Sequence, residues 1–382
     1  MTIKNFKSSK ARREYLEKEL KLNLKNIGYF SLDEKKVKNR NCENMIGATQ
    51  VPLGIAGPLI INHQPSVISH YLPLATTEGA LVASVNRGCK AAKLSGGINV
   101  FVEEIGCTRG PVFITKSISQ SFKFKNWLDG NFDRLQKTAN KTSSYLTLKK
   151  LGTRFVGRNV YVRFYFKTSE AMGMNMATIA TQKMADLIKR KTGIKCLSLS
   201  GNFCVDKKPS WLNFISGRGK RVWAEVIIKK KIVKEILKTT PERIIEVVNK
   251  KCLLGSIMSG SLGFNSHYAN IISALFLAVG QDMAHVVEGS LGITTAELEN
   301  NNDLYFSIYL PDLMVGTVGG GTHLKTQKEA LSILGLDKGK TGNAFRLAEI
   351  IGGAVLAGEL SLIAALSSGH LVKAHQRLGR GE

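Results

Sequence analysis

The segment Gly201-Asn-Phe-Cys-Val-Asp-Lys-Lys-Pro-Ser-Trp-Leu-Asn-Phe-Ile-Ser-Gly-Arg-Gly-Lys220 separates two different sequence patterns. The part before it is rich in β-branched and aromatic residues, and the part after it contains long apolar stretches. At its centre Asp206 precedes two lysines, and Pro209 biases Lys208 toward an extended conformation. Adjacent side chains of an extended segment point in different directions. One ammonium can therefore enter a site while the other binds an anion, although the motif taken alone is more typical of a solvated loop.

Several other segments are rich in the small and polar residues that occur at functional sites. They are, in order, Glu43–Leu59, Thr76–Cys89, Glu170–Met176, Gly280–Ala284, Gly316–Thr322, Gly358–Ser361 and Gly369–His375. Together with the lysine segment they resemble 3-hydroxy-3-methylglutaryl-coenzyme A reductase in its class I form. The resemblance runs from about residue 43 to about residue 377. A chance match of so many motifs in a fixed order is not expected.

The residue patterns also divide the chain into parts. Residues 1–46 are charged and helix-prone, whereas Pro111–Thr115, Arg154–Gly157 and Asn159–Phe166 predict strands, and Lys183–Lys191 predicts a helix. Ala269–Ala284 is apolar on nearly all faces and predicts a buried helix. The resemblance implies an α+β fold with a large mixed α/β substrate (CoA-binding) domain around a buried central helix, residues 47–110 and 199–382. A small ferredoxin-like NAD(P)-binding domain, residues 111–198, would be inserted in it.

Composition narrows the possible compartments and partners. No apolar run reaches the roughly 18 residues that span a membrane, and the charged N-terminus lacks a signal-peptide pattern. We therefore expect a cytoplasmic protein without a membrane partner. The six cysteines form no CxxC pair, which argues against disulfides and against a metal site, so we expect no metal.

The formal net charge of +25 would suit nucleic acid, an anionic surface or phosphate-bearing small molecules. No nucleic-acid-binding signature is present, so we expect no nucleic-acid partner. Coenzyme A and NADP both carry phosphates that a basic enzyme attracts, although a lysine-rich solvated surface explains most of the charge.

The implied reaction reduces 3-hydroxy-3-methylglutaryl-CoA to mevalonate and CoA with two NADPH, and NADH is possible. Four residues are expected to be catalytic: Glu78 as proton donor, Lys207 as oxyanion cation, Asp282 as its partner, and His375 as acid for the CoA thiolate. From the sequence alone, Asp282 near the end of an apolar helix needs a partner or a raised pKa. Glu78 has a plainer interpretation as a first-turn glutamate of a helix capped by a threonine.

The resemblance also assigns binding roles. Substrate binding is implied for Ser84, Asn86, Arg87, Arg109, Ser200, Asp206, Lys208 and Asn270, with an apolar wall formed by Leu81, Leu362, Ala365 and Leu366. Cofactor binding is implied for Ser143, Ser144, Glu170, Met172, Gly173, Met174, Asn175, Gly319 and Gly320. The plainer interpretation of the alternating methionines is that they fill a core. The partner implied is a second copy of the chain, in a homodimer or homotetramer with the site at the subunit interface.

Two alternatives stay open. Ser144 stands where the class I pattern commonly has an arginine for the NADP 2′-phosphate, and Lys149, Lys150, Arg154 or Arg158 would have to replace it. An NAD-linked oxidative mevalonate dehydrogenase of the same fold is therefore an alternative function. A basic nucleic-acid-binding protein is a more remote one, because it leaves the four catalytic candidates unexplained.

Overall fold

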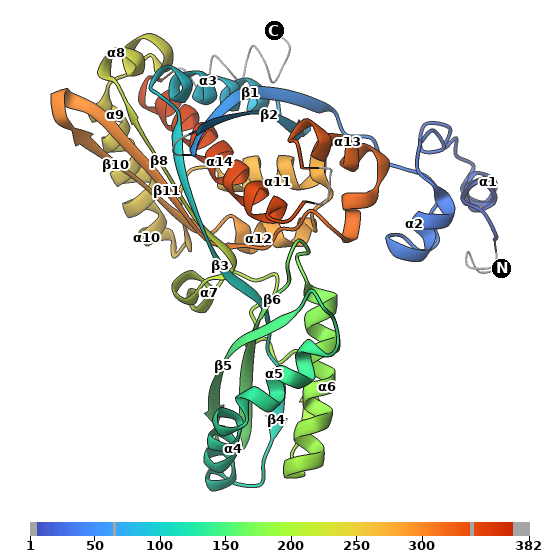
Figure 1. The fold of residues 1–382 in the computed structure, drawn as a ribbon. Helices are drawn as coiled ribbons and strands as arrows, with labels where there is room; N and C mark the ends of the chain where they lie inside the picture. Colours follow the sequence, from blue (N-terminus) through green and yellow to red (C-terminus); the bar gives the residue numbers. More distant parts are fainter. Residues whose placement is uncertain (1–5, 64–65, 337–339, 370–382) are drawn as a thin grey trace.

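The computed structural model describes residues 6–63, 66–336 and 340–369, which form a large lobe, a small lobe and an N-terminal arm (Figure 1). The α-helices of eight or more residues are α1 (Ser9–Leu20), α3 (Leu81–Leu94), α4 (Ile118–Gly130), α5 (Phe132–Asn140), α6 (Met174–Thr192), α11 (Tyr268–Val279), α13 (Lys325–Ile333) and α14 (Asn343–Ser367). Shorter α-helices are α2 (Glu34–Arg40), α7 (Trp211–Ser216), α8 (Lys230–Ile232), α9 (Pro241–Val247), α10 (Ser256–Ser259) and α12 (Val286–Gly289).

The strands of the described residues join into a single bent sheet. They are β1 (Leu53–His63), β2 (Ser66–Ala75), β3 (Ile98–Arg109), β4 (Val112–Ile114), β5 (Thr147–Val156), β6 (Asn159–Lys167), β7 (Lys195–Ser198), β8 (Arg218–Ile228), β9 (Gly263–Phe264), β10 (Gly292–Glu299) and β11 (Asp303–Leu313). The order along the sheet is β7-β4-β6-β3-β8-β11-β10-β9; β1 also pairs with β3, β2 pairs with β1, and β5 pairs with β6. The predicted α+β fold with two domains is confirmed by this architecture and by the structural neighbour reported below.

One strand, β3, joins the two lobes. Its first part, Asn99–Gly106, pairs antiparallel with β8 in the large lobe, and its last part, Cys107–Arg109, pairs with β6 in the small lobe. Gly106 sits at the transition with φ +100°, and a Cβ there would meet the carbonyl oxygen of Phe166 at 2.7 Å. The lobes therefore share an unbroken strand that bends at a glycine.

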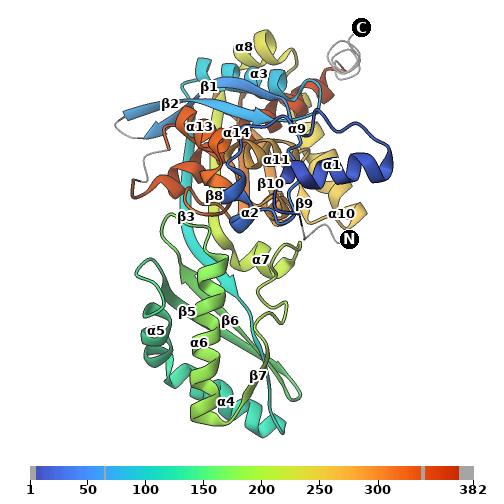
Figure 2. The same cartoon turned by 90° about the vertical axis from the view of Figure 1, so that its right-hand side faces the viewer.

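The small lobe has a hydrophobic core of its own. Strands β4, β5, β6 and β7 pair antiparallel, and α6 packs along their sheet (Figure 2). The apolar run Val160–Phe166 supplies much of this core, and Phe164 and Phe166 are fully buried. The expected strands are confirmed, and the expected helix begins earlier than predicted, at Met174.

The large lobe is organised around α14 and α11, which the sheet and α3 cover (Figure 1). Helix α14 is long and apolar enough to cross a membrane, but 83% of its most apolar window is buried inside the protein, as in the core helix of a globular fold. Its glycines permit this packing, because a Cβ at Gly352 would meet Val222 at 2.6 Å and one at Gly358 would meet Ile271 at 2.7 Å.

Helix α11 is the buried helix expected from the sequence, but it is shorter than predicted. It ends at Val279, where Gly280 adopts a left-handed conformation with φ +72° and its N–H bonds to Phe276 O. A glycine at this position is a common helix terminator. Asp282 consequently lies beyond the helix, at the start of the 3₁₀ turn Met283–His285.

Candidate functional site

The lysine segment forms a strained loop between β7 and α7. Asn202, Val205 and Lys207 all have positive φ angles, 60°, 48° and 58°, which is unfavourable for residues with a Cβ and most of all for a β-branched valine. Such strain persists only where the surroundings hold the backbone, and it is concentrated at functional sites. The loop is therefore the first place to look for chemistry.

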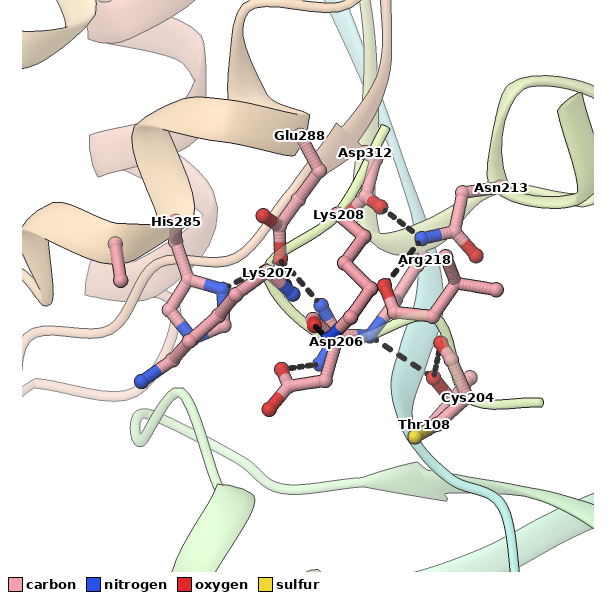
Figure 3. A network of polar contacts seen from close by, with 12 residues as sticks. Thr108, Cys204, Asp206, Lys207, Lys208, Asn213, Arg218, His285, Glu288 and Asp312 are labelled. Carbon is pink, nitrogen blue, oxygen red and sulfur yellow. Dashed lines mark hydrogen bonds and ion pairs between the residues drawn. The ribbon is translucent and has the colours of Figure 1, made fainter. Parts of the chain in front are cut away.

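A network of buried polar groups holds this loop in place (Figure 3). Arg218, at the start of β8, donates to Asp206 Oδ1 at 2.6 Å and to Glu288 Oε1 at 2.7 Å, and its side chain is fully buried. Glu288 Oε1 also accepts the backbone N–H of Lys207 at 3.0 Å. The backbone of the catalytic candidate is thus fixed by a buried carboxylate.

Further contacts tie the same loop to the sheet. Thr108 donates its hydroxyl to Cys204 O at 3.1 Å, and Asn213 donates its amide to Val205 O at 3.0 Å and to Asp312 Oδ2 at 2.6 Å. Burial raises the pKa of Asp312 to about 7, and the charge of Glu288 adds to the rise while Arg218 opposes it. The Cys204 thiol is free and buried, as the sequence led us to expect.

Lys207 and Asp282 form the ion pair that the sequence predicted. The ammonium Nζ lies 2.8 Å from Asp282 Oδ2, and the two side chains are 39% and 37% exposed. Partial burial would raise the pKa of Asp282, but hydrogen bonds from Lys207 and from Ala284 N–H, with the charges of His285 and Lys207, lower it overall. The alternative of a raised pKa for Asp282 was wrong, because the carboxylate has a partner. The pair presents a charged, solvent-accessible ammonium.

The Lys208 ammonium has a different partner from that of Lys207. Its ammonium donates to the backbone carbonyl of Asp206 at 3.2 Å, and its side chain is exposed. The two adjacent lysines therefore diverge, as expected for a non-helical segment.

Glu78 lies outside any helix, so the interpretation as a capped first-turn glutamate was wrong. Helix α3 begins at Leu81 after Ala80, which has φ +71°, and no threonine side chain caps it. Thr76 Oγ1 instead accepts the backbone N–H of Glu78 at 3.0 Å. The Glu78 carboxylate accepts a hydrogen bond from Asn270 Nδ2 at 3.1 Å, which joins two of the sequence-predicted site residues.

The remaining substrate candidates lie mostly where α3 meets α14. Arg87 donates to Ser361 Oγ at 3.0 Å and to Ser361 O at 2.6 Å, and burial lowers its pKa. Ser84 donates to the same hydroxyl at 3.0 Å, whereas Asn86 accepts the backbone N–H of Gly57 at 3.0 Å. The four residues of the expected apolar wall differ in exposure. Leu81 and Ala365 are buried, whereas Leu362 and Leu366 are partly exposed.

Arg109 and Ser200 lie on the small-lobe side of the lysine loop. Arg109 ends β3, and its buried Nε has no hydrogen-bond partner among the described residues. Ser200 Oγ lies 3.8 Å from Cys204 Sγ. An arginine nitrogen left without a partner is a group that an anionic ligand can satisfy.

The Glu170–Met176 segment begins with a carboxylate that serves the fold. Glu170 Oε1 accepts the N–H of Gly342 at 2.7 Å, and Oε2 accepts the N–H of Ala344 at 2.7 Å, so this side chain caps the N-terminus of α14. Gly173 has φ +97°, and a Cβ there would meet the side chain of Thr168 at 2.2 Å.

The other cofactor candidates of this segment divide between core and surface. Met172, Met174 and Met176 pack against the small-lobe core, as the plainer interpretation expected. Asn175 is exposed.

A second glycine-rich run packs against this segment. Ala171 and Val318 form a parallel bridge, and a Cβ at Gly316 would meet Met172 N at 2.4 Å. Gly319 and Gly320 have positive φ angles of 88° and 56° and face open space. Backbone groups of two loops therefore line one exposed surface between the lobes.

Ser143 and Ser144 lie just before β5, at the end of the small lobe nearest the large lobe, where Thr147 pairs with Lys167. Ser143 Oγ contacts Met176 Sδ at 3.6 Å, and Ser144 is exposed. Lys149 and Lys150 follow within a few residues, and Lys150 Nζ lies 4.4 Å from the centre of the Tyr165 ring. Arg154 lies near the other end of β5, about 23 Å along the strand from Thr147, and Arg158 lies beyond it. Only the two lysines therefore remain as substitutes for an arginine at Ser144.

Residues 8–380 match the family model described as hydroxymethylglutaryl-coenzyme A reductase. The chain belongs to this family. It is 52% identical over 379 residues to 3-hydroxy-3-methylglutaryl-coenzyme A reductase of Methanocaldococcus jannaschii, covering 98% of this chain and 93% of that protein. It is 42% identical over 378 residues to 3-hydroxy-3-methylglutaryl-coenzyme A reductase 1 of Hevea brasiliensis, covering 97% and 65% of the two chains.

A solved structure supports the fold. The class II 3-hydroxy-3-methylglutaryl-CoA reductase of Streptococcus pneumoniae, bound to NADPH in open conformations, superposes with a TM-score of 0.71 at 17% identity, covering 94% of this chain and 97% of that one. Its class differs from the class I form expected from the motifs, and at this identity the likeness concerns the fold alone.

For this reductase-family chain, sequence reasoning missed most of the buried network. Arg218, His285, Glu288, Asp312 and Asn213 were not among the candidates, although all are fully buried. A signal existed for Asp312 and Glu288, because each is an acidic residue within an otherwise apolar stretch. His375, in contrast, lies outside the described residues.

Asp206, His285 and Glu288 are three potential metal ligands whose atoms lie within 4.8 Å of one another. Arg218 occupies the position between two of them, donating to Asp206 and to Glu288. Because this guanidinium already donates to two of the three ligands and supplies positive charge there, the cluster fits an arginine better than a metal ion.

Proposed function

We propose that this protein reduces 3-hydroxy-3-methylglutaryl-CoA to mevalonate and free CoA with two equivalents of reduced nicotinamide cofactor, in the mevalonate pathway of isoprenoid synthesis. The observation that carries the proposal is the Lys207 ammonium, held 2.8 Å from Asp282 on a strained loop of a chain 52% identical to a reductase of this name. Hydride addition to a thioester carbonyl builds negative charge on oxygen. A fixed, accessible ammonium is the group that stabilises such charge.

Each neighbour of Lys207 has a separate part in this chemistry. Asp282 keeps the ammonium charged and oriented, while Glu288 and Arg218 hold the backbone beneath it. Lys208 and Arg109 would bind the carboxylate of the hydroxymethylglutaryl group, because both cations lie beside the loop and Arg109 Nε lacks a partner among the described residues. His375 would protonate the departing CoA thiolate.

The site proposed here needs a second subunit. Glu78 contacts Asn270 in the first turn of α11, whereas Asp282 and Lys207 pair beyond its last turn. Nine helical residues separate Asn270 from Val279, which is about 14 Å along the axis. Within the described residues Glu78 makes no ion pair with Lys207, so a proton donor and an oxyanion cation from one chain do not meet. Two chains related by a twofold axis would bring Glu78 of one to Lys207 of the other.

The residues present fit a nicotinamide cofactor. Gly319 and Gly320 leave open space beside the Glu170–Met174 segment, where an added Cβ would meet nothing within 4 Å, and the small lobe adds Ser143 and Ser144. When bound, the cofactor supplies the hydride. Backbone groups at the two glycines would hold the phosphates of the cofactor. Met172 would exclude water from its nicotinamide ring.

The preference for NADPH over NADH is expected to depend on the residue at position 144, which is a serine here. A charge-assisted contact to the 2′-phosphate is worth roughly 1.5–3 kcal/mol. Without an arginine at Ser144, we expect the preference for NADPH to be lower by about tenfold to a hundredfold, and Ser144→Arg to restore it. The ratio of kcat/KM for the two cofactors measures this. An unchanged strong preference for NADPH would mean that Lys149 or Lys150 binds the phosphate.

The finer assignments follow the sequence motifs. The class I form is proposed on the order of the motifs, and the identity to the class II structure is only 17%. Residues 47–110 and 199–382 would be the substrate domain, and residues 111–198 the cofactor domain, in accord with the two separate hydrophobic cores. A cytoplasmic location is proposed because the membrane-length helix found among the described residues, α14, is mostly buried inside the protein.

The direct test is a spectrophotometric assay. Purified protein with 3-hydroxy-3-methylglutaryl-CoA and NADPH should oxidise two equivalents of NADPH for each CoA thiol released. The same assay with mevalonate, CoA and each oxidised cofactor measures the opposite direction. Turnover confined to mevalonate oxidation with NAD would favour the oxidative alternative, and no turnover in either direction would overturn the proposal.

A further inference from the structure

Four side chains and one backbone group form a closed circuit around Lys207. Glu288 Oε1 lies 2.6 Å from His285 Nδ1, His285 Nε2 lies 3.8 Å from Asp282 Oδ2, and the same Asp282 oxygen pairs with Lys207 Nζ at 2.8 Å. The backbone N–H of Lys207 closes the circuit on Glu288 Oε1 at 3.0 Å. Lys207 is therefore held at both ends, by its amide and by its ammonium; Figure 3 shows Glu288, His285 and Lys207 together.

The hydrogen bonds define the protonation of Glu288. Its Oε1 accepts from Arg218 and from Lys207 N–H and lies 2.6 Å from His285 Nδ1, whereas its Oε2 has no partner within the described residues. An oxygen that accepts from a guanidinium and from an N–H fits an ionised carboxylate, which can only accept. Nδ1 of His285 is therefore a donor and carries a proton.

The surroundings of Nε2, the second ring nitrogen of His285, indicate whether the ring carries a second proton. His285 is fully buried, and within the described part of the chain Nε2 has no hydrogen-bond partner. A neutral ring with its proton on Nδ1 would turn the Nε2 lone pair toward the Asp282 carboxylate, which is repulsive. A proton on Nε2 converts the same geometry into an ion pair.

The charges around the ring favour that extra proton. Four carboxylates face this region, Asp282 and Glu288 from the ring's own segment, Asp206 from the loop and Asp312 from β11. Three permanent cations face them, Lys207 from the loop, Arg218 from β8 and Arg163 from β6. The Cys107 thiol of β3 is neutral, because burial raises its pKa to about 12. Among these groups the carboxylates outnumber the cations by one, since Lys208, the other cation of the loop, is exposed and donates to the Asp206 carbonyl.

We propose that His285 is an imidazolium that bridges Glu288 and Asp282 and so positions the Lys207 ammonium for the reaction. The competing place for the proton is Asp312, since burial raises its pKa to about 7. A proton there would leave His285 Nε2 and Asp282 Oδ2 facing each other as two acceptors. A proton on His285 satisfies both. His285 and Glu288 are thus positioning residues that act through Asp282 and through the Lys207 backbone.

The proton can be observed in the unmodified protein. In the full chain labelled with ¹⁵N-histidine, NMR at pH 7 should show both ring nitrogens of His285 protonated. The signal is assigned by its loss in His285→Gln, or by elimination against the other six of the seven histidines. A ring protonated on one nitrogen alone overturns the proposal, and this result does not depend on any catalytic activity.

Kinetics separate positioning from mere support of the fold. The inference rests on the proposed reductase function for this second test. His285→Gln keeps a donor toward Glu288 but cannot carry charge, so kcat should fall by about tenfold to a hundredfold, the range typical of residues that orient a catalytic group from behind. KM for 3-hydroxy-3-methylglutaryl-CoA should stay within about twofold, and the pH dependence of kcat should shift.

The matched control is His70→Gln, a buried histidine on β2, which should leave the pH profile unchanged. An unaltered kcat and pH profile in His285→Gln would overturn the positioning role. Failure of the unmodified protein to reduce 3-hydroxy-3-methylglutaryl-CoA would instead count against the proposed function and leave the NMR result standing.

Discussion

The two ends of helix α11 are built on the same plan and differ in one respect. At the N-terminal end the buried Glu359 of α14 accepts the N–H groups of Ser266 at 2.6 Å and of His267 at 3.0 Å, and the hydroxyl of Thr294 at 2.9 Å. At the C-terminal end the buried Glu288 holds the lysine loop. Each buried glutamate thus supports one half of the proposed site: the end that bears Asn270, or the loop that bears Lys207.

The difference lies in how each carboxylate is satisfied. Both oxygens of Glu359 accept hydrogen bonds, and all three donors are neutral: two backbone N–H groups just before α11 and the Thr294 hydroxyl of β10. Glu288 concentrates its donors on one oxygen and leaves the other without a partner in the described residues. A fully satisfied carboxylate is a rigid support, whereas a half-satisfied one beside a histidine can respond to charge. The comparison indicates that the N-terminal end of α11, which bears Asn270, is held rigidly. At the C-terminal end, beside Lys207, the buried groups can respond to a change of charge; we call this the tuned end.

The largest effect should come from removing the tuned end's cation. Lys207→Ala deletes a preorganised charge at the developing oxyanion, which typically costs about 3–4 kcal/mol in the transition state, or 10²–10³-fold in kcat. Because Lys207 is partly exposed, the free energy of unfolding should change little. Lys208→Ala should instead raise KM for the substrate. Steady-state kinetics and urea denaturation of both variants measure this, and exchanged phenotypes would reverse the assignment within the pair.

Mixing two inactive variants tests whether the two ends work together across subunits. Glu78→Ala and Lys207→Ala proteins, unfolded together in equal amounts and refolded, should regain about a quarter of the unmodified activity. Half of the pairs formed are mixed, and one of the two sites in a mixed pair contains both original residues. Each variant refolded alone is the control. A mixture as inactive as its components would place both residues in one chain's site and break the comparison.

Stability should distinguish the two buried glutamates. Glu288→Gln breaks a buried ion pair with Arg218, and we expect a loss of about 3–5 kcal/mol in the free energy of unfolding. Glu359→Gln removes hydrogen bonds to neutral donors and should cost about 1–3 kcal/mol. Only Glu288→Gln should also lower kcat in the fraction that remains folded. Denaturation curves and kinetics together test this, and equal losses of stability with equal kcat would mean that both ends are plain structural supports.

The sequence predicted one ion pair of this arrangement and missed the rest for a physical reason. A carboxylate near an apolar helix needs a partner, which is enough to link Asp282 to Lys207. Arg218, His285 and Asp312 meet only because β8, the turn after α11 and β11 converge on one loop, and nothing local in the sequence specifies that convergence. The helix predicted over Ala269–Ala284 overlooked one local signal, since Gly280 after an apolar helix is a common terminator and α11 ends at Val279.

Local signals misled at Glu78 for the opposite reason. Two threonines before a run of small apolar residues match a helix cap, yet Ala80 begins α3 in a left-handed conformation and Thr76 binds Glu78 N–H outside the helix. The tertiary contact with Asn270 decides the position of Glu78. Site residues held by long-range contacts are therefore where sequence reasoning is weakest.

The smallest effect concerns Asp312, which lies behind the tuned end. Burial raises its pKa to about 7 in the folded protein, against about 3.9 for an unfolded aspartate. Between these values the folded state retains a proton that the unfolded state has lost, so this group makes stability fall as the pH rises, and its cost is complete above pH 7.

Asp312→Asn cannot ionise and still offers an oxygen to Asn213. We expect the variant to match the unmodified protein near pH 4 and to exceed it by about 1–3 kcal/mol at pH 8. Urea denaturation at both pH values measures the difference. Parallel stability curves would mean that Asp312 is ionised at both pH values, with its charge compensated by Arg163 and Arg218.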